Sequence, residues 1–170
     1  MAVRWLGAIE HAESRLAHPS MKLWPIARNG TVDTPLVLPG AAEPVLAMVT
    51  TLYRTVEYRK PWIAYLASEG DRVVGTCAFK SAPDDGRVEI AYFTFPEHEG
   101  QGVATRMVAG LLDLARAESP RLIVAAQTLP QESASTRILR KHGFEFHGSV
   151  QHPEDGLVWE WRRAASANET

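Results

Sequence analysis

The segment from Phe93 to Thr105 holds the residues whose types and spacing most clearly permit chemistry. A predicted strand runs through a turn with Gly100 and Gly102 directly into a predicted helix. The first amide groups of a helix lack an internal hydrogen-bond partner and lie at the positive end of its dipole. Because glycine carries no Cβ atom, this turn leaves its backbone uncovered and can bind a phosphate or diphosphate. The alternative is a plain connection in which glycine only relieves strain.

The spacing of the turn excludes two common phosphate-binding motifs. A Walker loop ends in Gly-Lys-Ser or Gly-Lys-Thr, and this turn has no lysine. A dinucleotide fingerprint needs a third small residue three positions after its second glycine, where Thr105 stands. The remaining pattern is Gly-x-Gly-x-Ala, made by Gly100, Gly102 and Ala104.

This pattern resembles the cofactor turn of the GNAT superfamily of acetyl-CoA-dependent N-acetyltransferases. That turn reads Arg or Gln, two residues, Gly, one residue, then Gly or Ala; Gly102 and Ala104 match, whereas Glu99 replaces the usual cation or amide. The segment from Ser135 to Phe144 is similar to the family's closing helix, which ends in Lys-x-Gly-Phe. The serine eight residues before Gly143 is similar to the ribosomal-protein N-terminal acetyltransferase (RimJ/RimL-like) branch. The resemblance spans residues 66–161.

The resemblance implies acetyl transfer from acetyl-CoA to a primary amine of a small molecule or a protein N-terminus, by direct attack in a ternary complex. It implies that the backbone amides of Phe93, Thr94 and Phe95 pair with the pantetheine arm, and that one of them donates to the oxyanion. It assigns the diphosphate to the turn and first helical residues, namely Gly100, Gln101, Gly102, Val103, Ala104 and Thr105. The acceptor side is expected around residues 43–58.

Glu89 is the candidate general base. The acceptor amine must lose a proton, and a carboxylate whose pKa is raised by an apolar setting can accept it. Strand alternation places Glu89 on one face with Ala91, Phe93 and Phe95, and a glutamate here resembles the base of some family members. The alternative is a glutamate that points to solvent or pairs with an arginine.

Ser135 is the candidate proton donor to the departing thiolate. Family members commonly carry a tyrosine four residues before the glycine of Gly-Phe, but here that position is Leu139. The ribosomal-protein branch uses a serine at the helix start, which corresponds to Ser135. The alternative is that Ser133 or Ser135 only caps the helix. Glu132 departs from the asparagine usual in that branch.

The elements that must position these residues predict an α+β fold, a mixed and mostly antiparallel twisted sheet flanked by helices, as in the resembled family. Helices are expected over 43–58, 101–117 and 132–142, and strands over 21–28, 62–67, 72–80, 87–95, 121–127, 144–151 and 157–161. We expect an N-terminal helical extension over 1–20, one domain over 21–163 and a flexible tail over 164–170. The N-terminal helix is expected to pack either on this domain or on a second subunit, so a homodimer is one possible assembly.

Composition narrows the function classes. The 170 residues, 45% hydrophobic and 22% charged with a net charge of −2, indicate one globular domain and argue against nucleic-acid binding. No apolar run is long enough to span a bilayer, and the charged N-terminal segment is unlike a signal peptide. A single cysteine, Cys77, excludes an internal disulfide and favours the cytoplasm, and the histidines show no metal-ligand spacing. A non-catalytic acyl-CoA-binding module and a nucleotide-binding domain are the rival interpretations.

Overall fold

The computed structural model describes residues 19–164, so the predicted helix within residues 1–20 and nearly all of the predicted tail lie outside the described residues. One seven-stranded sheet has the order β1-β2-β3-β4-β5-β7-β6. Its strands are β1 (Met21–Pro25), β2 (Ala64–Glu69), β3 (Arg72–Phe79), β4 (Arg87–Thr94), β5 (Ile123–Thr128), β6 (Glu145–His152) and β7 (Gly156–Ala164). Only β4 and β5 pair in parallel, which confirms the predicted mixed and mostly antiparallel sheet.

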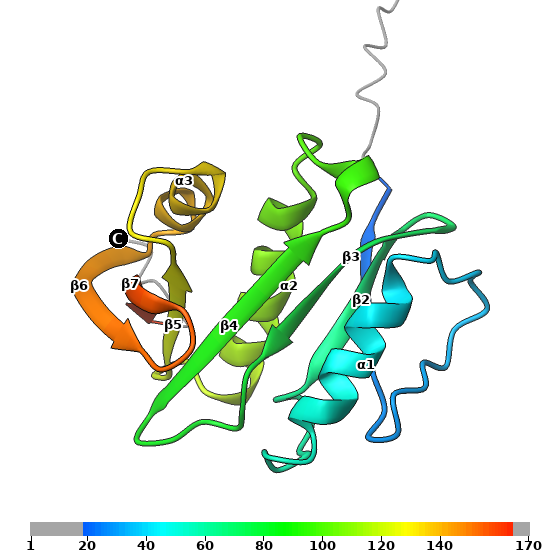
Figure 1. The fold of residues 1–170 in the computed structure, drawn as a ribbon, viewed down its shortest axis with the longest axis horizontal. Helices are drawn as coiled ribbons and strands as arrows, with labels where there is room; N and C mark the ends of the chain where they lie inside the picture. Colours follow the sequence, from blue (N-terminus) through cyan, green and yellow to red (C-terminus); the bar gives the residue numbers. More distant parts are fainter. Residues whose placement is uncertain (1–18, 165–170) are drawn as a thin grey trace, which may run out of the picture.

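Helices cover the sheet on both faces (Figure 1). Helix α1 (Ala42–Leu52) lies over β2 and β3 on one face, and α2 (Val103–Glu118) lies behind β4 on the other. Helix α3 (Ala134–Lys141) packs on β5. A short 3-10 turn (Pro96–His98) links β4 to the glycine turn. No helix in residues 19–164 is long and apolar enough to cross a membrane.

Helix α1 is shorter than predicted. It was expected to continue to residue 58, but it ends at Leu52. The segment that follows is rich in β-branched residues, which are weak helix formers. Tyr53 also leaves the helix to make tertiary contacts: its hydroxyl donates to the carbonyl of Ile26 and accepts the amide of Ala64. These contacts anchor the end of α1 to β2.

The close approach of α2 to the sheet determines where its N-terminus lies. Its inner face is fully buried, with Met107, Val108 and Leu111 at 0% exposure. Opposite them, a Cβ atom on Gly75 of β3 would come within 2.6 Å of the Phe93 carbonyl and 3.2 Å of the Met107 side chain. Only glycine fits there, so the contact brings the first turn of α2 beside the end of β4.

Strands β4 and β5 diverge halfway along their length. Their parallel register runs from Arg87 opposite Ile123 to Ile90 opposite Ala126 and then stops, although β4 continues to Thr94. The backbone groups of β4 on this side are therefore left without a strand partner beyond Ile90. Helix α2 lies on the β4 side of this divergence and α3 on the β5 side (Figure 1).

Candidate acyl-transfer site

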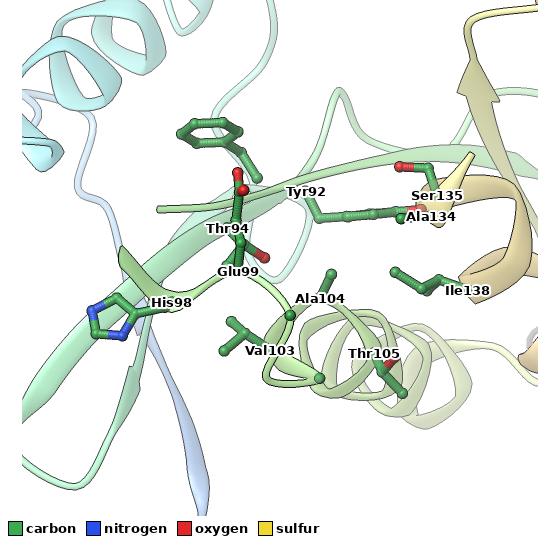
Figure 2. Close-up of a pocket in the computed structure, with 13 residues that line it drawn as sticks. Tyr92, Thr94, His98, Glu99, Val103, Ala104, Thr105, Ala134, Ser135 and Ile138 are labelled. Carbon is green, nitrogen blue, oxygen red and sulfur yellow. The ribbon is translucent and has the colours of Figure 1, made fainter. Parts of the chain in front are cut away.

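A cavity of about 470 Å³ lies where β4 and β5 diverge, and we call it the cofactor cavity. It brings together most of the predicted site residues, namely Phe93, Thr94, Gly100, Gly102, Val103, Ala104, Thr105 and Ser135. Its wall also contains residues that were not predicted for the site: Tyr92, His98, Ala134 and Ile138. Figure 2 shows Tyr92 extending from β4 toward Ser135, with Ile138 pointing into the space beside Ala104.

The glycine turn presents a run of free backbone amides. Within residues 19–164, no amide from Gly100 to Thr105 donates to a protein acceptor, and the N-cap of α2, Gly102, makes no side-chain capping bond. Both glycines adopt the left-handed region, with φ of 72° at Gly100 and 74° at Gly102. Such a run at the positive end of a helix fits the diphosphate of a nucleotide-type ligand.

Arg106 supports this turn from below. Its guanidinium donates to the carbonyl of Gln101 at 2.8 Å and also donates to the carboxylate of Glu69 on β2. A Cβ atom on Gly102 would lie 2.8 Å from Arg106 Nη1, so the guanidinium lies directly against the turn. Gln101, predicted as a cofactor residue, does not line the cavity; it contributes its carbonyl to this support.

The open edge of β4 belongs to Tyr92 and Thr94 rather than to Phe95. The Phe95 amide donates to the Val74 carbonyl on the β3 side at 3.0 Å, and its side chain is 2% exposed. The prediction that the Phe95 amide binds the cofactor is therefore wrong. Since β3 and β4 pair without a bulge from Ile90 to Thr94, alternation directs the Phe93 amide toward β3 as well. Phe93 nevertheless lines the cavity.

Tyr92 and Ser135 lie near each other in the wall of the cofactor cavity (Figure 2). Helix α3 is capped by Ser133, whose hydroxyl accepts the Thr136 amide in a capping box, so Ser135 is not needed for the cap. The Ser135 side chain instead lies beside Tyr92 in the cavity wall. Burial raises the pKa of Tyr92, and the neighbouring Ser135 hydroxyl lowers it to a smaller extent. Tyr92 therefore stays protonated near neutral pH and can donate a proton.

The sequence did contain a signal for Tyr92. Leu139 stands where the family usually has a tyrosine on the closing helix. No tyrosine on that helix could therefore be assigned as proton donor to the thiolate. The structure instead brings a tyrosine from β4 to the start of α3. Strand alternation places the Tyr92 side chain on the face of β4 opposite to those of Glu89 and Phe93, and this could be predicted from the sequence.

Glu89 lies in different surroundings from those expected. Its carboxylate contacts the Lys80 ammonium and lies 3.7 Å from Arg87 Nη2, so the predicted apolar setting is wrong. Glu89 lines a second cavity, of about 550 Å³, together with Lys80 and Arg87, and it does not line the cofactor cavity. The pairing with an arginine considered from the sequence is present.

Glu99 and Cys77 lie in contrasting surroundings. Glu99 is exposed and lines the cofactor cavity near the glycine turn. Cys77 is 1% exposed, and burial raises the pKa of its thiol, so it is a packing residue and not a nucleophile. Within residues 19–164, no group of three or more metal-ligating side chains is present.

Comparison with known proteins identifies the family. A sequence model of the acetyltransferase (GNAT) domain matches residues 29–145, which include the glycine turn and α3. The chain belongs to the GNAT acetyltransferase family. This GNAT protein is 26% identical over 122 residues to the uncharacterized N-acetyltransferase p20 of Bacillus licheniformis, across 71% of this chain and 67% of that protein.

Solved structures share the GNAT fold. RimL, a ribosomal-protein alpha-N-acetyltransferase, superposes with a TM-score of 0.64 at 15% identity, covering 88% of this chain and 96% of RimL. The putative acetyltransferase yncA from Salmonella typhimurium, solved with acetyl-CoA, gives a TM-score of 0.58 at 17% identity over 89% of this chain and 98% of its own. These likenesses confirm the predicted fold class.

Proposed function

We propose that this GNAT protein is an N-acetyltransferase that moves the acetyl group of acetyl-CoA to a primary amine of a small molecule or a protein N-terminus by direct attack. The observation that carries the proposal is the meeting, in one cavity, of free turn amides and an unpaired strand edge. The turn suits a diphosphate, and the edge suits an extended amide-bearing arm. Acetyl-CoA joins both in one molecule, and yncA was solved with it.

The proposed binding uses backbone more than side chains. The diphosphate accepts hydrogen bonds from amides between Gly100 and Thr105, with the Thr105 hydroxyl as a further donor. The pantetheine amides pair with the free backbone groups of Tyr92 and Thr94, as an added strand would. The arm then ends beside Ser135, where the thioester lies.

The co-substrate supplies an acetyl thioester, whose carbonyl carbon forms a C–N bond with the amine while its C–S bond breaks. In the proposed step Tyr92 donates its proton to the departing thiolate, and the Ser135 side chain lies beside the phenol. The acceptor, an ammonium near neutral pH, first releases one proton to become a nucleophile. After attack its nitrogen releases a second proton, which replaces the one that Tyr92 gave to the thiolate. Acetylated amine, free coenzyme A thiol and one proton are the products, so atoms and charge balance.

The proposed acceptor of the amine proton remains Glu89. Because Glu89 lies in the second cavity against Lys80, the proton must reach it through water around that ion pair. We also infer a cytoplasmic location from the single, buried thiol.

The test is a calorimetric titration with acetyl-CoA, followed by thiol release with a panel of polyamines, aminoglycosides, amino acids and peptides. We expect micromolar binding and turnover of at least one amine class. Binding without turnover of any amine would favour the acyl-CoA-binding module, for which Glu99 at the cavity wall is the supporting observation. Tighter binding of NAD than of coenzyme A would favour a nucleotide-binding domain.

A further inference from the structure

A third cavity, of about 380 Å³, adjoins the cofactor cavity, and we call it the acceptor cavity. The two share Tyr92 and Ser135 as lining residues. It is lined by Ala91 and Tyr92 of β4 and by Gln127 and Thr128 of β5, so it lies where the two strands diverge. The lining includes none of the glycine-turn residues, so a molecule bound there would approach Tyr92 and Ser135 from outside the diphosphate turn.

Within residues 19–164, the acceptor cavity is lined by one charged side chain, that of Lys80. Its polar lining consists of the neutral side chains of Gln127, Thr128, Gln131 and Ser133, besides the shared hydroxyls, and of one cation, Lys80. Among the described residues that line it, there is no aspartate or glutamate. An acceptor with several positive charges would meet Lys80 without a compensating carboxylate, and like charges at close range repel.

The carboxylate that contacts Lys80 is shared with a second cation. Glu89 contacts Lys80 but also faces Arg87. Glu160, with a side chain 6% exposed, is held between Arg87 and Arg162. Lys80 keeps a side chain 41% exposed and lines the acceptor cavity, whereas Asp84 and Asp85 line only the second cavity. A lysine ammonium has three donors, so contact with Glu89 leaves donors for a ligand.

We propose that Lys80 binds a carboxylate on the acceptor, and that the acceptor is a small amine carrying that carboxylate, such as an amino acid. This inference rests on the proposed function, because it places the amine of the same molecule at the Tyr92–Ser135 end. The cavity volume suits a small molecule. Lys80 thus selects the acceptor and takes no part in bond making.

The experiment compares amino acids with their own carboxamides, which keep the amine and lose the negative charge. In wild-type protein we expect kcat/KM for the acid to exceed that for the carboxamide by about tenfold to a hundredfold, the usual effect of one charged hydrogen bond. Lys80→Met should reduce this ratio to near one, and Lys80→Arg should retain most of it. Lys141→Met, an exposed lysine outside the three cavities, is the matched control and should keep the wild-type ratio.

Two further readouts separate this inference from the proposed function. Acetyl-CoA affinity should be the same in all variants, which also reports correct folding. Amino-acid binding to the coenzyme A-loaded protein, followed by calorimetry, should be lost in Lys80→Met whether or not turnover occurs. Binding of the amino acid but not of its carboxamide, without any turnover, would support the acceptor site and refute the proposed acetyltransferase activity. Preference for spermidine or kanamycin, or an acid-to-carboxamide ratio unchanged in Lys80→Met, would overturn the role of Lys80 alone.

Discussion

Replacing Gly102 by alanine tests the diphosphate turn directly. Gly102 has a φ of 74°, and a Cβ atom there would lie 2.8 Å from Arg106 Nη1. The left-handed backbone costs an L-residue about 1–2 kcal/mol, so the free energy of unfolding should fall by about that amount. The guanidinium must also move, which loosens its bond to the Gln101 carbonyl.

The effect on ligand binding follows from the amides of the same turn. A hydrogen bond to a charged group contributes about 1.5–3 kcal/mol, so misplacing one amide should raise the Kd for coenzyme A by about tenfold to a hundredfold. Pantetheine lacks the diphosphate, and its Kd should stay unchanged. Calorimetric titration of both ligands measures the difference.

Gly86→Ala is the matched control. Gly86 has a similar φ of 70°, its Cβ position is open, and it lies outside the cofactor cavity. We expect a comparable loss of stability, read from urea unfolding, with the wild-type Kd for coenzyme A. Equal Kd values for coenzyme A in Gly102→Ala and Gly86→Ala would refute the assignment of the diphosphate to this turn.

Three further predictions concern catalysis and stability. Tyr92→Phe should lower kcat about tenfold or more with little change in the Kd for acetyl-CoA, and Ser135→Ala should have a smaller effect in the same direction; an unchanged kcat in both would exclude the proton-donor role. Glu89→Gln should lower kcat at pH 7, and the loss should shrink as the pH rises and the acceptor amine deprotonates by itself; a loss independent of pH would indicate a purely structural role. Burial raises the pKa of Tyr53 to about 12, above the value near 10 of an unfolded chain. The free energy of unfolding should therefore fall as the pH rises from 10 through 12. Tyr53→Phe should weaken that pH dependence and should lower the free energy of unfolding by about 2–4 kcal/mol at neutral pH, because two hydrogen bonds are lost. Melting curves across pH 8–12 measure it, and an unchanged slope in the variant would contradict it.

Local signals in the sequence were enough to predict the turn. Gly100, Gly102 and Ala104 mark a turn and a helix start through residues adjacent in the chain, and the structure has both within two residues of the predicted positions. The order of strands and helices followed from hydrophobic periodicity in the same way. These features depend on neighbours in sequence, so pairing partners were not needed to predict them.

Contacts between distant segments were harder to predict. The direction of the Phe95 amide depends on which strand lies on each side of β4. The environment of Glu89 depends on the β3–β4 register that places Lys80 beside it, and the role of Tyr92 depends on α3 returning to the diverging strands. The end of α1 at Leu52 likewise reflects the contact of Tyr53 with Ala64. In each case tertiary contact outweighed local propensity.

The divergence of β4 from β5 divides the sheet into two parts joined by a short seam. Helix α2 packs on β1, β3 and β4, whereas α3 packs on β5, so each part carries its own helix. A ligand arm that pairs with β4 and also contacts α3 would connect the two parts of the sheet. Ligand binding to the folded state raises thermal stability in proportion to RT ln(1 + [L]/Kd). The thermal stability of this protein would then depend on the concentration of acetyl-CoA. At low acetyl-CoA concentration, only the short β4–β5 pairing would join the two parts of the sheet.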